Sequence, residues 1–356
     1  MPEETPEKPA QSPSSHRHSH SKTRLSPTLA ADLRRVKRLL PWLLVLVPIL
    51  TVFAAAFFAS GLAVGPQERW QRPLLPASRA GLSPQKVSFY TRDGIRIAAW
   101  FERPWIVAKP LGTVILVHGA QGNKTGMASY GGLLLQRGFS VLLPDLRAHG
   151  ESSGNYSSFG YREAADVLAA IAWVKQHSGG EPIVLFGYSA GAVAVLYAAA
   201  QSPDVTAVIV DSPHLDISDV LSRESDFVGA APRHAGVPAS YRFQLWLFTR
   251  PWMSGLARWV YGIRAGVPFE SPEADLLAAV GKIRRPAVLF LAAERDPVVP
   301  AEHTRRLFNA TASSNKQLVL QPGAYHSAMA GNPRRYLVTL TGFLEQTVQA
   351  VPAAAR

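Results

Sequence analysis

Gly187-Tyr188-Ser189-Ala190-Gly191 is the stretch of this chain that decides the fold. It follows a short β-branched apolar run, Ile183–Phe186, and precedes an alanine-rich run, Ala192–Ala200. Such a composition is typical of a strand that turns abruptly into a helix, where the glycines let both segments pack around a strained turn that exposes the serine hydroxyl. A serine among small residues is often only part of a turn. The strand and helix around it favour a nucleophile, and a nucleophilic serine needs partners elsewhere in the chain.

The composition of the 356 residues limits the class of protein. A hydrophobic share of 47% is enough to fill a large core, so the chain as a whole is not disordered. The absence of cysteine excludes thiol nucleophiles, thiolate metal sites and disulfides. The formal net charge is +12, but the basic residues are scattered and form no nucleic-acid-binding motif. We therefore expect no nucleic-acid partner, and favour an anionic membrane surface or an anionic substrate.

The N-terminal part of the chain combines a polar tail with a long apolar segment. Residues 1–38 are predicted to be a disordered basic tail, since the first 22 are rich in Pro, Glu, Ser and His. Residues 39–65 carry no charged residue, and a hydrocarbon core needs about 20 apolar residues to span it. This predicts one transmembrane signal-anchor helix. A cleaved export signal is the alternative, because small residues follow the apolar run, but the long preceding tail favours an uncleaved anchor.

Basic residues flank this apolar segment unequally. The nearest basic residues on the amino side are Arg24, Arg34, Arg35, Lys37 and Arg38, and those between the segment and residue 84 are Arg69, Arg72 and Arg79. The excess of positive charge on the amino side predicts a cytoplasmic N-terminus. We therefore expect a single-pass protein of the cytoplasmic (inner) membrane, with residues 66–84 as a proline-containing linker and the catalytic domain outside the cytoplasm.

From residue 85 to residue 350 the chain alternates predicted strands and helices. Asp93-Gly94 between two apolar runs predicts a β-hairpin. Continuous apolar runs predict buried strands at 113–117, 140–143, 183–186, 207–210, 287–291 and 317–320, with helices at 126–137 and 162–177 among the connections. This alternation predicts an α/β fold with a doubly wound, mostly parallel sheet.

Residues 212–270 interrupt the alternation and are too long for one crossover helix, so we predict an inserted helical cap. Within it, Pro251 is predicted to split residues 233–264 into two helices. Residues 233–264 include five arginines and no acidic residue, and a stripe of apolar residues recurs at helical spacing: Tyr241, Leu245, Phe248, Trp252, Leu256, Trp259 and Ile263. Packing of this stripe on the sheet is the favoured interpretation. The alternative is a lid that touches lipid head groups or covers an apolar substrate.

A serine nucleophile needs a general base, and the base needs an orienting carboxylate. His326 is the predicted base, because it follows the last strand and therefore lies at the carboxyl end of the sheet. Asp296, just beyond the strand at 287–291, is the predicted acid, with Asp211 as its rival and Glu294 as a weaker one.

Attack on a carbonyl creates an oxyanion that two backbone N–H groups usually stabilise. We assign these to Ala190, which follows the nucleophile, and to Ala120, favoured over Gln121 in the loop after residues 113–117. His118 is predicted to hold that loop and not to act as a base. This chemistry needs no metal or organic cofactor, so none is expected.

In their order and spacing, five segments resemble the α/β-hydrolase superfamily: His118-Gly119, the segment DLRAHGES at 145–152, Gly187–Gly191, Asp296 and His326. The resemblance covers about residues 85–346 and is strongest to membrane-anchored esterases and the prolyl-oligopeptidase-related branch. It implies that residues 145–152 form a structural loop near the site, with Ala148 where the family often has glycine. Ala120-Gln121 departs from the glycine-rich oxyanion loop of some lipases, which disfavours esters of bulky tertiary alcohols.

The expected function is that of a serine hydrolase that cleaves a carboxylic ester or thioester through an acyl-enzyme. Its substrate is expected to be a small-molecule or lipid-like acyl compound. A serine peptidase of the same fold is one alternative. A non-catalytic binding or scaffold protein that retains the fold is the other, and the complete set of Ser189, His326 and Asp296 argues against it.

Overall fold

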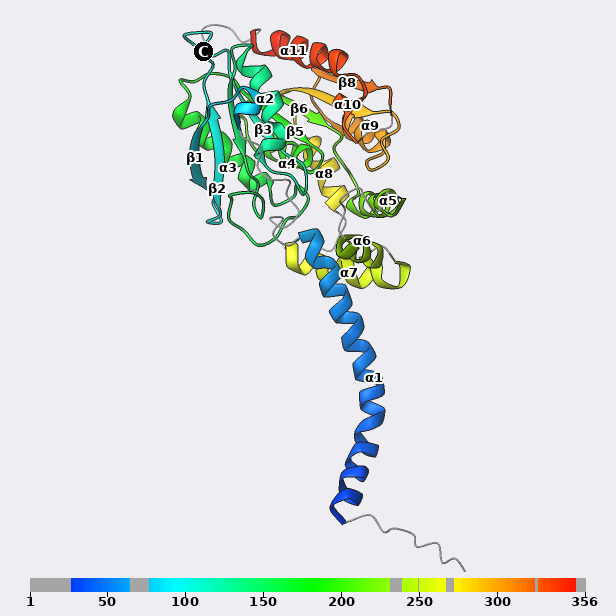
Figure 1. Ribbon diagram of the computed structural model, residues 1–356. Helices are drawn as coiled ribbons and strands as arrows, with labels where there is room; N and C mark the ends of the chain where they lie inside the picture. The colour runs from blue at the N-terminus through cyan, green and yellow to red at the C-terminus, as the bar shows by residue number, and fades with distance from the viewer. Residues whose placement is uncertain are drawn as a thin grey trace, which may run out of the picture. The chain divides into compact units, whose positions relative to one another are not determined.

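The computed structural model of the chain describes residues 27–64, 77–230, 239–248, 250–266, 272–323 and 326–349. The chain divides into two compact units, Met1–Thr51 and Val52–Arg356. Figure 1 labels the helices and strands of both. Each unit is described by itself.

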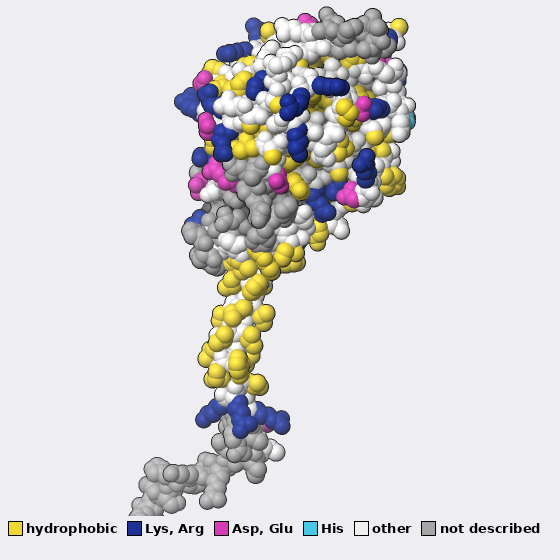
Figure 2. Space-filling model, turned by 180° about the vertical axis from the view of Figure 1, so that it is seen from behind, with side chains coloured by type: hydrophobic (Ala, Val, Ile, Leu, Met, Phe, Trp, Pro, Cys, Tyr) yellow, Lys and Arg dark blue, Asp and Glu magenta, His cyan; other side chains and the backbone are white. Residues whose placement is uncertain are grey.

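One long helix, α1 (Pro27–Val64), contains the apolar N-terminal segment. Within it, Arg35–Phe58 is long and apolar enough to cross a membrane, with a mean hydropathy of 2.4. Figure 2 shows basic side chains near the start of this helix, followed by hydrophobic ones. Residues 27–38 are helical, which corrects the predicted disordered tail over that range, because their Leu, Ala, Arg and Lys residues all favour helix. Residues 1–26 lie outside the described residues.

The predicted linker at 66–84 is also shorter than expected. A 3-10 turn at Ala77–Ala80 lies against α2 (Ala128–Leu135), and Leu82 is buried in the core next to it. The backbone approach is close, since a Cβ added at Gly132 would lie 2.0 Å from the Ala80 carbonyl oxygen. The folded part of the second unit therefore includes residues before the predicted boundary at 85, and residues 65–76 lie outside the described residues.

The second unit is built on one eight-stranded sheet with the order β1-β2-β4-β3-β5-β6-β7-β8. The predicted hairpin pairs β1 with β2 antiparallel, β2 pairs with β4 antiparallel, and the remaining neighbours are parallel. The strands are β1 (Gln85–Tyr90), β2 (Arg96–Glu102), β3 (Thr113–Val117), β4 (Ser140–Pro144), β5 (Ile183–Tyr188), β6 (Val205–Asp211), β7 (Ala287–Ala293) and β8 (Lys316–Gln321). The predicted α/β fold with a mostly parallel sheet is confirmed.

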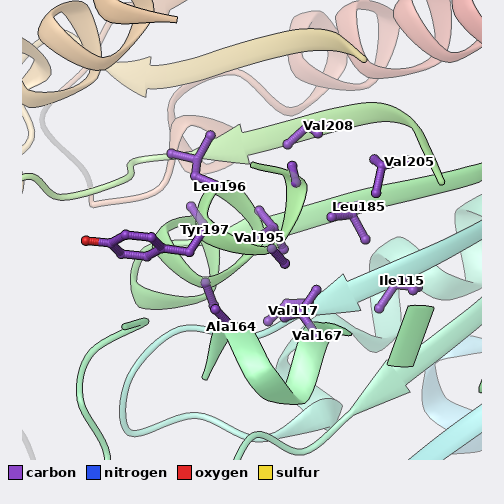
Figure 3. Close-up of a cluster of buried hydrophobic side chains, with 14 of the residues drawn as sticks. Ile115, Val117, Ala164, Val167, Leu185, Val195, Leu196, Tyr197, Val205 and Val208 are labelled. Atoms are coloured by element: carbon purple, nitrogen blue, oxygen red, sulfur yellow. The ribbon is translucent and has the colours of Figure 1, made fainter. Parts of the chain in front are cut away.

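Helices cover both faces of the sheet, and each face has its own apolar core (Figure 1). On one face, α3 (Ala164–His177) and α4 (Ala190–Ala199) pack on the strands through residues such as Val167, Leu185 and Val195 (Figure 3). On the other face, α2 and α11 (Pro333–Gln349) enclose residues such as Phe186 and Leu340. Strands β3, β4 and β7 are buried along their whole length, which explains their uninterrupted apolar sequences.

Three helices, α5 (Ile217–Ala230), α6 (Ala239–Phe248) and α7 (Pro251–Ala265), follow β6 where the cap was predicted, and Pro251 begins α7. They are followed by α8 (Pro272–Val280), and the remaining helices of this unit are α9 (Ala301–Ala310) and α10 (Ala328–Gly331). The short connection Lys124–Met127 is a 3-10 turn.

The predicted packing of the apolar cap stripe is wrong for Trp259 and Ile263. Trp259 and Ile263 are 41% and 60% exposed, and Leu256 is only partly buried. The buried residues of α6 and α7 include instead Leu247, Met253, Val260 and Tyr261. Leu256, Trp259 and Ile263 all follow Pro251 and lie on one side of α7, and the helix turns the neighbouring side, with Met253, Val260 and Tyr261, toward the buried cluster. The side chains of Tyr241, Leu245, Phe248 and Trp252 lie outside the described residues.

Candidate active site

Ser189 lies between β5 and α4 with φ 52° and ψ −120°, a backbone conformation that residues with a Cβ rarely adopt. The flanking glycines make this turn possible. A Cβ added at Gly187 would lie 2.3 Å from the Gly191 carbonyl oxygen, and one added at Gly191 would lie 2.3 Å from the His118 carbonyl oxygen. No larger side chain fits at either position without moving backbone. The strand–turn–helix arrangement predicted from the sequence is therefore present.

His326, in the loop between β8 and α10, contacts both predicted partners. Its Nε2 lies 3.0 Å from the Ser189 Oγ, and its Nδ1 lies 2.9 Å from the Asp296 Oδ2. The imidazole is about one quarter exposed, whereas the Asp296 side chain is fully buried. The structure thus brings together the three residues that sequence order alone had suggested.

Asp296 is held by the backbone of its own loop. Its Oδ1 accepts hydrogen bonds from the N–H groups of Val298, at 2.8 Å, and Val299, at 2.9 Å. This leaves Oδ2 for the His326 Nδ1. Asp296 does not cap the following helix α9, because the residue in the cap position is Pro300.

The rival carboxylates have other surroundings. Asp211, at the end of β6, is fully buried, and its Oδ1 accepts from the Ser212 hydroxyl at 2.9 Å and from the Ala328 N–H at 3.3 Å. Burial raises the pKa of the Asp211 carboxyl to about 6, although the Ser212 hydroxyl opposes the shift. The Glu294 side chain is exposed. Of the three candidates, the structure places Asp296 against the His326 Nδ1.

The loop after β3 lies directly against the serine. A Cβ added at Gly119 would lie 3.1 Å from the Ser189 Cβ, so the backbone that leads into Ala120 approaches Ser189 closely. Ala120 itself is partly buried, and Gln121 has a positive φ of 55°. On the other side, Ala190 is the first residue of α4 and is buried. Both predicted oxyanion residues are therefore neighbours of Ser189.

His118 holds this loop. Its Nε2 accepts a hydrogen bond from the Leu146 N–H at 3.0 Å, so the proton is on Nδ1, which donates to the Gly119 carbonyl oxygen at 2.8 Å. Burial, together with the nearby His149, lowers the pKa of His118 to about 3. The neutral ring uses both nitrogens, which agrees with the structural role expected for it.

Sequence reasoning missed one residue beside the site. The Tyr188 hydroxyl donates to the His326 carbonyl oxygen at 3.1 Å, and its ring lies 5.4 Å from the imidazole, measured between centroids. Tyr188 occupies the variable position before the serine in Gly-x-Ser-x-Gly, where the pattern carries no information about the side chain.

The side of the site that faces the cap is apolar. Ala190 belongs to a buried cluster with Leu221 of α5, Leu247 of α6 and Val260 of α7, and Ala120 packs against the same cluster. Among the residues that the structure describes, no group of three or more His, Asp and Glu could hold a metal ion. The site therefore consists of Ser189, hydrogen-bonded to the His326 imidazole, beside an apolar surface.

Comparison with known proteins bears on the family and the fold of the chain. A sequence model of the alpha/beta hydrolase family matches residues 114–339. The Bacillus subtilis (strain 168) protein YqkD is 28% identical over 236 residues, which are 65% of this chain and 71% of that protein. A thermostable monoacylglycerol lipase from Bacillus sp. (strain H-257) is 26% identical over 220 residues, which are 62% of this chain and 84% of that enzyme.

Solved structures show the same fold. The esterase Pf2001 of Pyrococcus furiosus superposes with a TM-score of 0.60 at 18% identity, over 77% of this chain and 95% of that one. The family model extends over more than half of the chain. The chain therefore belongs to the alpha/beta hydrolase family.

Proposed function

We propose that this chain is a serine hydrolase that cleaves a carboxylic ester or thioester through an acyl-enzyme. One observation carries the proposal: a continuous line of hydrogen-bond contacts runs from the Ser189 Oγ to His326 at 3.0 Å and from His326 to Asp296 at 2.9 Å. Nucleophile, base and orienting acid at these distances are what attack by a serine hydroxyl needs.

In the proposed reaction, the Ser189 Oγ attacks the acyl carbon while the His326 Nε2 takes the hydroxyl proton. Asp296 accepts a hydrogen bond from the Nδ1–H of His326, which keeps Nε2 free to act as a base and stabilises the imidazolium that forms. The backbone N–H groups of Ala120 and Ala190 stabilise the oxyanion. His326 then protonates the departing alcohol or thiol, and water attacks the acyl-enzyme with the same residue as base.

Two observations favour an acyl substrate with an apolar chain. The cluster under α5, α6 and α7 gives the surroundings of Ala120 and Ala190 an apolar character, which suits a hydrocarbon chain and offers little to a peptide. The Bacillus sp. relative is named for its action on monoacylglycerols. A lipid-like ester is therefore the favoured substrate class.

We further propose that the apolar part of α1 anchors the chain in the cytoplasmic membrane, with the tail before it in the cytoplasm and residues 85–350 outside. The length and composition of Arg35–Phe58 and the excess of basic residues before it support this topology. Residues 212–270 would form the cap over the site. A reporter that works only in the cytoplasm, fused after Arg356, is expected to be inactive. An active reporter would show that the chain has the opposite orientation.

A substrate panel tests the activity. Purified full-length protein and its Ser189→Ala variant are assayed with glycerol monoesters of short and long chains, acyl thioesters and dipeptide amides. Hydrolysis of esters that disappears in Ser189→Ala is expected. Cleavage of the amides alone would show that the protein is a peptidase and not an esterase. Ester turnover that survives in Ser189→Ala would show that Ser189 is not the nucleophile.

A further inference from the structure

A fully buried ion pair lies immediately after the loop at 119–123. The Lys124 side chain has no exposed surface, and its Nζ contacts the Oδ2 of Asp145, which is equally buried. The Lys124 backbone N–H donates to the other carboxylate oxygen, Oδ1, at 2.7 Å. A third contact joins Lys124 Nζ to the Glu151 Oε2 at 2.7 Å. Lysine is rarely buried, because removing its charge from water is costly even when it is paired.

This arrangement ties the loop at 119–123 to residues 145–151 at both of its ends. At the start of the loop, His118 accepts the Leu146 N–H, and at its end, Lys124 donates twice to Asp145. The segment at 145–151 is itself fixed to Asp145, whose Oδ2 also accepts the Glu151 N–H at 2.8 Å. One carboxylate therefore connects the two loops.

The loop held in this way is the one that lies against Ser189. The Cβ that Gly119 lacks would lie 3.1 Å from both the Ser189 Cβ and the Tyr188 ring, so the loop has little room to move toward the serine. Movement away from the serine is limited by its two ends. A misplacement of about 1 Å can cost on the order of 100-fold in rate, so the position of a hydrogen-bond donor in this loop is a sensitive quantity.

We propose that Lys124 and Asp145 are positioning residues that set the distance between the Ala120 N–H and the oxyanion formed at Ser189. The inference rests on the proposed serine hydrolase function and names a role for a buried pair that touches neither the nucleophile nor the base. It predicts that loss of the pair lowers the rate of the chemical step and leaves substrate binding nearly unchanged.

The same segment provides a matched control on its other side. The Arg147 backbone N–H donates to the Asp166 Oδ2 at 2.8 Å, and its Nε donates to Oδ1 at 2.9 Å. The Arg147 side chain is 5% exposed and that of Asp166 is fully buried. This pair has the same design as the first, one carboxylate that receives a backbone N–H and a buried cation, but it joins the segment to α3 and not to the loop at 119–123.

The experiment compares Lys124→Met with Arg147→Met in the full-length protein. The readouts are the second-order rate of labelling by a fluorophosphonate probe, kcat and KM on an ester substrate, and the thermal unfolding temperature. Both variants are expected to be destabilised. Lys124→Met should lower the labelling rate and kcat about 10- to 100-fold with KM within about threefold, whereas folded Arg147→Met should keep labelling and kcat within about threefold of the wild type. Equal losses in both variants, or a Lys124→Met rate within threefold of the wild type, would overturn the inference.

Glu151→Gln keeps the test decisive if Lys124→Met does not fold. Glu151 is 39% exposed at its side chain, so this change removes one charge from Lys124 without emptying the core. A labelling rate lowered about two- to fivefold with a nearly unchanged unfolding temperature supports the inference, and an unchanged rate overturns it. Labelling that persists in Ser189→Ala contradicts the proposed function itself. Labelling that requires Ser189 but has the same rate in Lys124→Met and Glu151→Gln as in the wild type contradicts only the role of Lys124 and Asp145.

Discussion

Asp296 and Asp211 are two buried aspartates in equivalent places, at or just after the carboxyl ends of the neighbouring strands β7 and β6, yet they have different partners. Asp296 turns one oxygen to two backbone N–H groups and the other to the His326 Nδ1. Asp211 turns one oxygen to the Ser212 hydroxyl and the Ala328 N–H. Burial raises the pKa of the Asp211 carboxyl to about 6.

The comparison teaches that burial and position after a strand do not by themselves bring a carboxylate into contact with His326. The direction of the free carboxylate oxygen decides which aspartate contacts His326. In Asp296 the N–H groups of Val298 and Val299 set that direction. Asp211 instead accepts a hydrogen bond from the N–H of Ala328, the first residue of α10, which lies two residues after His326.

The largest expected effect separates the two aspartates by activity. Asp296→Asn should lower kcat about 1,000- to 10,000-fold, because the amide no longer holds His326 in the tautomer whose Nε2 accepts the serine proton. The fold should survive, since the asparagine oxygen can still accept from Val298 and Val299. An ester hydrolysis assay measures kcat of the variant, and circular dichroism measures whether it is folded. A kcat within tenfold of the wild type would remove Asp296 from the site.

Asp211→Asn is expected to change the pH dependence of stability and to leave most of the activity. Because the pKa of this carboxyl is raised from 3.8 to about 6 on folding, the folded state binds its proton more tightly, and its stabilising contribution is lost as the pH rises through 6. The shift corresponds to about 3 kcal/mol. The free energy of unfolding of Asp211→Asn, relative to the wild type, should therefore increase by about this amount between pH 3 and pH 7.

Urea unfolding of both proteins at several pH values measures this difference. A difference that does not vary with pH would mean that Asp211 does not titrate as its burial implies. A loss of kcat as large as that of Asp296→Asn would mean that the two carboxylates share the role of orienting acid.

Tyr188→Phe should have the smallest effect, and it tests whether the Tyr188 hydroxyl helps to hold the loop that carries His326. The change removes the hydrogen bond to the His326 carbonyl oxygen, which is expected to cost about 1 kcal/mol of stability and to lower kcat two- to fivefold. Thermal unfolding and steady-state kinetics measure the two quantities. An unchanged kcat at lower stability would show that Asp296 positions His326 without help from Tyr188.

Most of the fold and the order of the site could be predicted from the sequence. The uninterrupted apolar runs identify β5 and β7 as strands buried on both faces, whereas the edge strand β8 is only partly buried. Parallel strands bring their carboxyl ends to one edge of the sheet, which places Ser189, Asp296 and His326 near one another. The choice between Asp296 and Asp211 rests on hydrogen-bond directions in two loops, and no periodicity encodes these directions.

Two errors have a similar origin. Helical spacing places Trp259 and Ile263 on one side of α7, but α7 turns the neighbouring side toward the buried cluster, and spacing alone does not say which side is buried. The contact of Tyr188 with the His326 carbonyl joins residues 138 positions apart, and only the folded chain reveals it. Local patterns predict elements well, whereas pairings across the sheet edge depend on the complete fold.

The most direct test of the central claim is to map the covalent adduct of a fluorophosphonate probe on the full-length protein by peptide mass spectrometry. The proposed mechanism predicts one adduct on the peptide that contains Ser189, formed much more slowly in His326→Ala and absent in Ser189→Ala. An adduct on another residue, or ester hydrolysis that continues when Ser189 is fully modified, would contradict it.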